Sequence, residues 1–182
     1  MHHIRILSAQ LLARGAPRAI PQMRTSPTPT MTMFPAVRAS NLNGRSFDLP
    51  GDFEGERNLV ILAFQREQQA LVDSWSPAIA NLLARYADLC FYELPTISRG
   101  NLLFRAWLDG AMRAGIPARP ARDHTISLYL DKAAFRQALD LPHEDTIYVL
   151  LFDRAGRVLW RSNGKHTAQL AGELEQVLIQ GS

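Results

Sequence analysis

Apolar residues group into strand-like and helix-like segments along most of this chain. A continuous apolar run over residues 58–64 predicts a strand buried on both faces. Residues 67–86 repeat apolar side chains at three- and four-residue spacing and predict a helix, in which Pro77 marks a kink or a new first turn. Residues 89–94 predict the next strand, which Pro95 is expected to end.

The middle of the chain continues this alternation. Residues 101–115 predict a second helix that ends at Gly115, with Leu103, Trp107 and Met112 facing inward. A polar segment, 116–123, is interpreted as a loop before a third strand at 124–130. Residues 131–139 then predict a short helix with Asp131 as its N-cap.

Turn residues predict a hairpin at each end of this series. Residues 42–55 contain three glycines and a proline and indicate a short hairpin. Strands at 146–152 and 157–161 flank the turn Asp153–Gly156, and an amphipathic helix at 167–179 closes the chain. This order predicts an α/β fold whose mixed sheet has a parallel core and a C-terminal antiparallel hairpin, with helices on both faces.

The N-terminal segment, residues 1–33, differs in composition from the rest. It is rich in arginine, has no acidic residue and contains the turn-prone SPTPT. It is interpreted as a disordered leader, a targeting peptide, a short secretory signal or the product of a start codon assigned too early. The folded domain is therefore expected over 34–182, in the cytoplasm if the protein is bacterial. A transit peptide would instead direct it to the matrix side of the mitochondrial inner membrane.

Charge and cysteine content exclude several classes of function. Six arginines lie within residues 1–47, where acidic residues are absent, so 14 of the 20 basic residues remain to balance all 17 acidic ones. The domain is mildly acidic, which argues against a nucleic-acid partner. A single cysteine, Cys90, rules out an internal disulfide and a zinc site built on several cysteines. No apolar run reaches the ~20 residues that a membrane helix requires.

The order of elements, together with the hairpin VLLFDRAGRVLWRSNG, resembles the thioredoxin-like superfamily over about residues 42–180. Within it, the resemblance is greatest to the branch that contains peroxiredoxins and membrane-facing thiol-disulfide proteins. A narrower resemblance is to the mitochondrial ATP synthase assembly-factor family and its bacterial relatives. The segments that carry it are LNGRSFDLP, FQREQQALVDSW, YELPTIS, GAMRAGI and HTISLYLDKAAFRQAL. This resemblance implies a chaperone-like role in the assembly of a membrane complex.

The resemblance also shows where redox chemistry would be expected and what occupies those positions. The Cys-x-x-Cys pair of redox relatives would fall near Gln69 and Val72, and their cis-proline near Thr146. Without a thiolate at the helix N-terminus no mixed disulfide can form there. Cys90, between Leu89 and Phe91, is interpreted as a buried strand residue, and a thiol peroxidase or reductase that uses Cys90 stays as the alternative.

A binding role is the better prediction. Amide and charged side chains gather at the first strand–helix junction, and arginines in or near GAMRAGI are expected to form a basic rim, unless they are simply solvated. Trp75 and Trp107 are expected in the core. No histidine spacing or glycine pattern indicates a metal, a nucleotide or another cofactor, although a small molecule at the former active-site face remains open. The predicted binding residues are Gln65, Arg66, Gln69, Arg113, Arg122 and Thr146, with Arg119 also on the rim.

Overall fold

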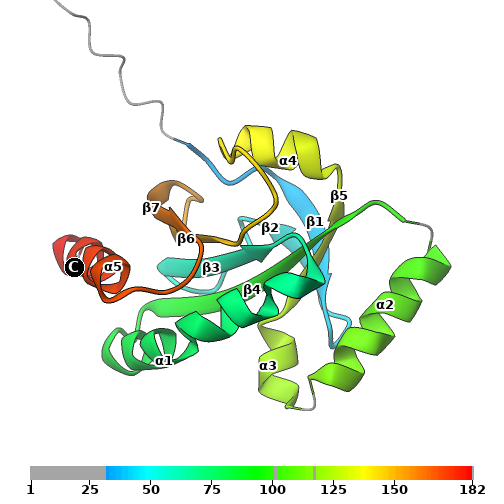
Figure 1. Ribbon diagram of the computed structural model, residues 1–182, viewed down its shortest axis with the longest axis horizontal. Coiled ribbons are helices and arrows are strands. Elements are labelled where there is room, and N and C mark those ends of the chain that lie inside the picture. The colour runs from blue at the N-terminus through cyan, green and yellow to red at the C-terminus, as the bar shows by residue number, and fades with distance from the viewer. Residues whose placement is uncertain (1–31, 101, 117, 182) are drawn as a thin grey trace, which may run out of the picture. The chain divides into compact units, whose positions relative to one another are not determined.

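The computed structural model describes residues 32–100, 102–116 and 118–181. These residues form one seven-stranded sheet in the order β2-β1-β5-β4-β3-β6-β7 (Figure 1). The central strands β3, β4 and β5 are parallel, and the other neighbours pair antiparallel. The strands are β1 (Val37–Asn41), β2 (Ser46–Leu49), β3 (Arg57–Ala63), β4 (Leu89–Ser98), β5 (Ile126–Leu130), β6 (Tyr148–Asp153) and β7 (Val158–Asn163).

Helices cover both faces of this sheet, so the predicted α/β class and mixed sheet are confirmed. Helices α1 and α5 lie on one face and α4 on the other, as Figure 1 shows. The helices are α1 (Gln69–Arg85), α2 (Leu102–Gly115), α3 (Arg119–Asp123), α4 (Lys132–Ala138) and α5 (Ala168–Gln180), and a 3-10 turn η1 (Arg66–Gln68) precedes α1.

Two apolar clusters, one on each face of the sheet, form the core. On the α1 and α5 face, Trp75 is fully buried and donates its indole N–H to the carbonyl of Gly164 at 3.0 Å. On the opposite face, Phe34, Phe53 and Phe152 pack edge-to-face or stacked beneath α4. Because β3 is buried over nearly its whole length between these clusters, its continuous apolar run was a reliable strand signal.

Several predicted elements are confirmed within a few residues. Strand β3 and helices α1 and α5 lie where the apolar pattern placed them, and Pro77 lies inside α1. Asp131 is the N-cap of α4, since its carboxylate accepts hydrogen bonds from the amides of Ala133 and Ala134. The turn Asp153–Gly156 joins β6 and β7, and Gly156 has the positive φ of 83° that favours glycine.

Three predictions about local structure were wrong. Pro95 does not end β4, because it stands opposite Ala63, the last residue of β3, just before β4 begins to pair with β5 at Thr96. The segment expected to be a loop contains the short helix α3, with Pro120 in its first turn. Leu103 and Trp107 do not face the core as expected, since 83% of Leu103 and 68% of Trp107 are exposed.

Two residues next to the predicted start of the domain contact the sheet. The carbonyl of Thr32 accepts a hydrogen bond from the amide of Val158 at 2.9 Å, and Met33 forms a bridge with Arg157. The proposed leader, 1–33, otherwise lies outside the described residues, so its nature stays a prediction. Across the described ranges, no helix combines the length and hydropathy needed to span a membrane.

Candidate functional site

A large groove opens between the sheet and helices α1, α2 and α3. Its volume is about 1250 Å³, and its floor is strand β4. Helix α2 forms one wall with Trp107, Leu108, Ala111 and Met112. The β3–α1 junction closes one end with Phe64, Gln65, Arg66 and Gln69, and α3 lies near the other with Pro120 and Ala121. The groove is mainly apolar, as ligand sites usually are.

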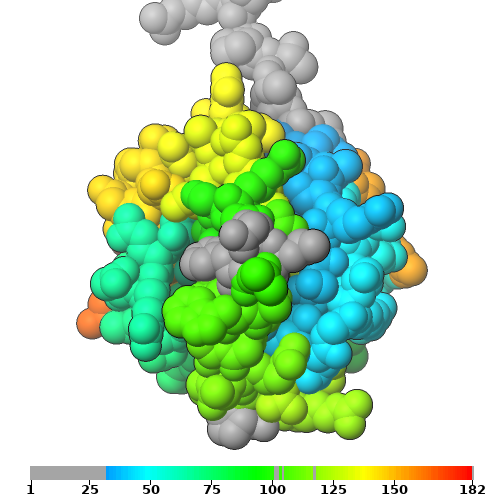
Figure 2. All heavy atoms as spheres, turned by 90° about the vertical axis from the view of Figure 1, so that its right-hand side faces the viewer, coloured from blue at the N-terminus to red at the C-terminus, as the bar shows by residue number. Residues whose placement is uncertain are grey.

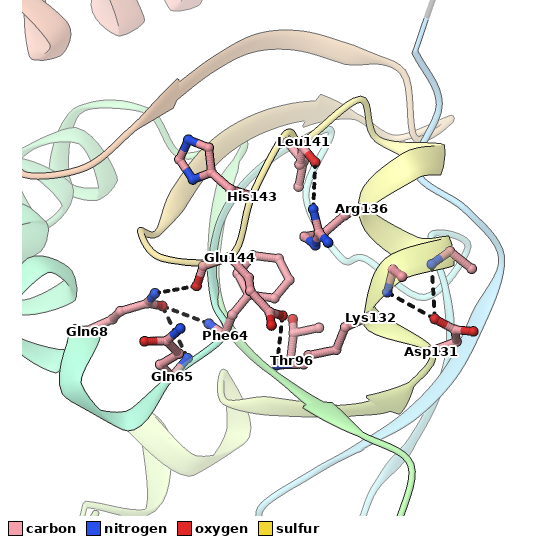
Figure 3. A network of polar contacts seen from close by, with 12 residues as sticks. Phe64, Gln65, Gln68, Thr96, Asp131, Lys132, Arg136, Leu141, His143 and Glu144 are labelled. Atoms are coloured by element: carbon pink, nitrogen blue, oxygen red, sulfur yellow. Dashed lines mark hydrogen bonds and ion pairs between the residues drawn. The ribbon is translucent and has the colours of Figure 1, made fainter.

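The β3–α1 junction is held in place by one buried amide, Gln68. Its side-chain oxygen accepts hydrogen bonds from the backbone amides of Phe64 at 2.8 Å and Gln65 at 3.3 Å. Its nitrogen donates to the carbonyl of Glu144 at 2.9 Å, in the loop before β6 (Figure 3). Only 3% of Gln68 is exposed, so this residue shapes the end of the groove without being offered to a ligand.

The floor of the groove contains a carboxylate that has no partner. Glu93 stands opposite Ile61 in the parallel ladder, so its side chain emerges on the α1 face and faces the groove. Within the described part of the chain, its carboxylate makes neither a hydrogen bond nor an ion pair. Burial in this apolar surrounding, with Asp73 nearby, raises the pKa of Glu93 above its usual value.

The same floor includes a strand edge that is open on one side. Strand β4 pairs with β3 from Leu89 to Pro95, but it pairs with β5 only from Thr96, apart from an isolated bridge between Glu93 and Thr125. Among the described residues, the first part of β4 therefore has a strand partner on one side only. Leu89, Cys90 and Phe91 of this part line the groove.

Helix α2 is anchored through polar contacts. The Tyr129 hydroxyl donates to the Asp109 carboxylate at 2.6 Å, and the Arg105 guanidinium lies 5.1 Å from the centre of the Tyr129 ring. No side chain described for α2 is fully buried, and its apolar residues face the groove or solvent. Figure 2 views this side of the molecule, with α2 in green between the β1–β2 hairpin in blue and α1 in teal.

The structure brings together three of the six predicted binding residues. Gln65, Arg66 and Gln69 line the groove where it meets the β3–α1 junction. Gln69 also donates from its amide to Asp73 at 2.9 Å. Thr146 lies two residues beyond Glu144 in the loop that Gln68 holds, and it is not part of the groove lining.

The predicted basic rim is divided between two places. Arg113 donates to the carbonyl of Leu42 at 2.7 Å, and Arg122 donates to the side-chain oxygen of Asn43 at 3.0 Å. Arg119 accepts through its carbonyl a hydrogen bond from the Asn43 amide at 3.2 Å. Arg113 and Arg122 thus join α2 and α3 to the β1–β2 turn, whereas Arg66 stands at the junction.

Cys90 lies in β4 with intermediate burial and packs against the core on the α4 face. Burial raises the pKa of its thiol, with a smaller contribution from the carboxylate of Glu54. The thiol is therefore protonated at neutral pH, which opposes nucleophilic attack. Among the described residues there is no cluster of three or more His, Cys, Asp or Glu side chains that could hold a metal ion.

Sequence reasoning missed Glu93 as a candidate residue and assigned Trp107 to the wrong environment. A signal for Glu93 was present, because it is the only charged residue in the otherwise apolar stretch LCFYELPTI. For α2 the helical periodicity placed Trp107 and Met112 on the face that lines the groove, but Leu103, which was predicted on the same face, does not line it. Periodicity could not show that this face borders a groove.

Comparison with known proteins identifies the fold. No protein-family model and no curated protein matches the chain. Among solved structures, one from Aquifex aeolicus VF5, described as an electron transport protein, has a TM-score of 0.58 and 11% identity over 81% of this chain and 94% of its own. BsSco, a member of the Sco family of cytochrome c oxidase assembly proteins, has a TM-score of 0.55 and 13% identity over 82% of this chain and 93% of its own.

A third similar structure is a secreted Mycobacterium tuberculosis disulfide oxidoreductase homologous to E. coli DsbE. Its TM-score is 0.50, with 13% identity over 80% of this chain and 96% of its own. These likenesses confirm that the fold is thioredoxin-like. At such low identity they carry no further assignment.

Proposed function

On this thioredoxin-like fold with its single thiol, we propose that the protein acts by binding a segment of another polypeptide in the groove, without thiol–disulfide exchange. We further propose that this binding assists the assembly of a membrane complex such as ATP synthase. The observation that carries the first proposal is the large apolar groove beside the β3–α1 junction. The junction presents Gln65, Arg66 and Gln69 to the groove and contains no cysteine.

The groove is suited to a polypeptide by its size and its wall. Its volume of about 1250 Å³ exceeds the range of about 300–1,000 Å³ typical of small-molecule sites. Trp107, which is 68% exposed, extends the apolar surface outward, and exposed aromatic side chains are characteristic anchors of protein interfaces.

The assembly role rests on the resemblance of LNGRSFDLP, GAMRAGI and the junction segment to the ATP synthase assembly-factor family. Two of these segments also meet in space, since Arg113 of GAMRAGI donates to the Leu42 carbonyl of LNGRSFDLP. This contact gives the pair a shared structural reason to occur in one chain.

A complementation experiment tests the proposal. In cells that lack the protein, native gels should show less assembled ATP synthase, and the wild-type gene should restore it. Trp107→Glu should fail to restore it, because a charge in the groove wall opposes an apolar segment. Leu103→Glu is the matched control, since Leu103 lies on the same helix, is 83% exposed and does not line the groove.

The variant Cys90→Ser distinguishes polypeptide binding from the alternative of thiol chemistry at Cys90. We expect this variant to complement fully and the wild-type protein to be inactive in insulin reduction and peroxide turnover. Activity that disappears in Cys90→Ser would overturn the binding function in favour of thiol chemistry. Unchanged ATP synthase in cells that lack the protein would overturn the assembly role and leave groove binding to be judged directly.

A further inference from the structure

The groove contains ionisable side chains in addition to its apolar walls. Besides Cys90, its ionisable lining residues are Arg66, Glu93 and His124. Of these, Glu93 lies on the floor of the groove, in the middle of strand β4, which is hydrogen-bonded to β3. A partly buried carboxylate at such a position is costly unless it is paired, and among the described residues no cation pairs with it.

The surrounding charges do not relieve this cost. Asp73 is close enough to act on Glu93, and its negative charge opposes ionisation of the Glu93 carboxyl. Gln69 donates its amide to Asp73, and the two residues give Glu93 no positive charge. The floor of the groove thus combines apolar contact with a carboxylate that no described side chain pairs, which is the complement of an apolar segment that carries one positive charge.

The open edge of β4 adds a second feature that a polypeptide would use. Alternate backbone groups of a strand point to either side, and the amide of Glu93 already donates away from β3, to the carbonyl of His124 at 2.9 Å. By this alternation the amide and carbonyl of Phe91 point to the same side, along the edge that lacks a strand partner. An extended segment could hydrogen-bond there, as in strand addition.

We propose that the occupant of the groove is an extended apolar segment of another polypeptide with a single lysine or arginine, whose cation pairs with Glu93. This inference rests on the proposed function and names the chemistry of its partner. The aromatic rings of Phe91 and Trp107, which also line the groove, suit the same cation.

A peptide selection tests the inference with the full chain. Immobilised protein is exposed to a pool of ten-residue apolar peptides whose central residue is lysine, arginine, norleucine or glutamate, and the retained peptides are counted by mass spectrometry. We expect lysine and arginine peptides to be retained about tenfold more than norleucine peptides, a typical effect of one desolvated charge pair. In Glu93→Gln this preference should disappear.

The controls separate the inference from the proposed function. Glu93→Gln keeps the shape of the side chain, and Glu67→Gln changes an exposed carboxylate that does not line the groove. Retention of apolar peptides without a preference for a basic residue, or with a preference that survives in Glu93→Gln, would overturn the inference and leave groove binding intact. Equal retention by wild type and Trp107→Glu, or no retention at all, would overturn polypeptide binding in the groove and the inference with it.

Discussion

At the scale of a single residue, Gln68 fixes the backbone of the junction after β3 through three hydrogen bonds. Its amide bonds two backbone N–H groups of its own loop and one carbonyl of the loop before β6. All three partners would lose a hydrogen bond if the side chain were removed, and the amide of Phe64 would lose a fully buried one. Leaving a buried polar group without a partner destabilises the folded state by more free energy than a typical hydrogen bond contributes to it.

Gln68→Ala should therefore destabilise the protein by about 1–3 kcal/mol, the cost of leaving buried polar groups unpaired. Urea unfolding followed by circular dichroism measures the change. Gln69→Ala is the matched control, because its exposed side chain bonds only Asp73, and such surface changes stay within about 0.5 kcal/mol. Equal effects of the two substitutions would show that the Gln68 network does not support the junction.

Glu93 should make opposite contributions to stability and to binding. The folded protein raises the pKa of the Glu93 carboxyl, mainly by burial. Folding therefore opposes the ionisation that the unfolded chain undergoes above the ordinary pKa of 4.5. Glu93→Gln should therefore raise the melting temperature at pH 7.5. The gain should vanish as the pH falls below 4.5, where the carboxyl is protonated in both states.

Thermal unfolding of wild type and Glu93→Gln between pH 3.5 and 8 measures this dependence, with Glu67→Gln as the reference. A gain that persists unchanged at pH 3.5 would mean that the side chain contributes through packing instead of charge. A loss of stability at neutral pH would indicate that Glu93 has a favourable partner in the folded protein.

At the scale of elements, α2 is the helix whose apolar face is left uncovered by the domain. Its attachment depends on Tyr129 and Asp109 in the middle of the helix and on Arg113 near its end. Burial and the adjacent Asp109 carboxylate raise the pKa of Tyr129, so its hydroxyl remains a donor at all ordinary pH values. Helices held in this way open locally at low cost compared with the core.

Tyr129→Phe should loosen α2 while the sheet stays intact. Loss of one hydrogen bond, about 1 kcal/mol, should raise amide exchange several-fold over residues 102–115 and leave β3 and the first part of β4 unchanged. Hydrogen exchange with mass spectrometry measures both regions. Tyr148→Phe is the matched control, because its hydroxyl bonds the carbonyl of His143 and its loss should affect that loop instead. Faster exchange throughout the sheet would show that α2 and the core open together.

The elements also show which parts of the fold could be read from the pattern of residues. β3 and α1 were predictable because their buried faces are long and regular. α3 was not, because RPARD has no apolar periodicity and is helical through its local turn alone. The exposure of Trp107 was equally beyond reach, since periodicity identifies a face of a helix but not what covers it. Glu93 became a candidate only when register and burial placed its carboxylate in the groove.

For the whole molecule, Arg57 joins parts of the chain that are distant in sequence. Its guanidinium pairs with both carboxylate oxygens of Asp88, in the turn before β4, and donates to the carbonyl of Leu178 in α5. The Arg57 side chain is only 8% exposed, whereas Asp88 is 42% exposed. The start of β3, the start of β4 and the C-terminal helix are thereby held by one buried charge.

Asp88→Ala should destabilise the domain by about 1–2 kcal/mol at pH 7, less than the 3–5 kcal/mol of a fully buried pair because Asp88 is partly solvated. The hydrogen bond from Arg57 lowers the pKa of Asp88 below its usual 3.8, so the contribution is complete above that pH and is lost as the pH falls through the lower folded value. Urea unfolding at pH 7 and at pH 2.5 should thus show a difference between wild type and variant that shrinks in acid. Asp48→Ala, which breaks the exposed pair with Arg38, should produce no such pH-dependent difference. An Asp88→Ala effect of equal size at both pH values would contradict the role of this ion pair in holding the three elements together.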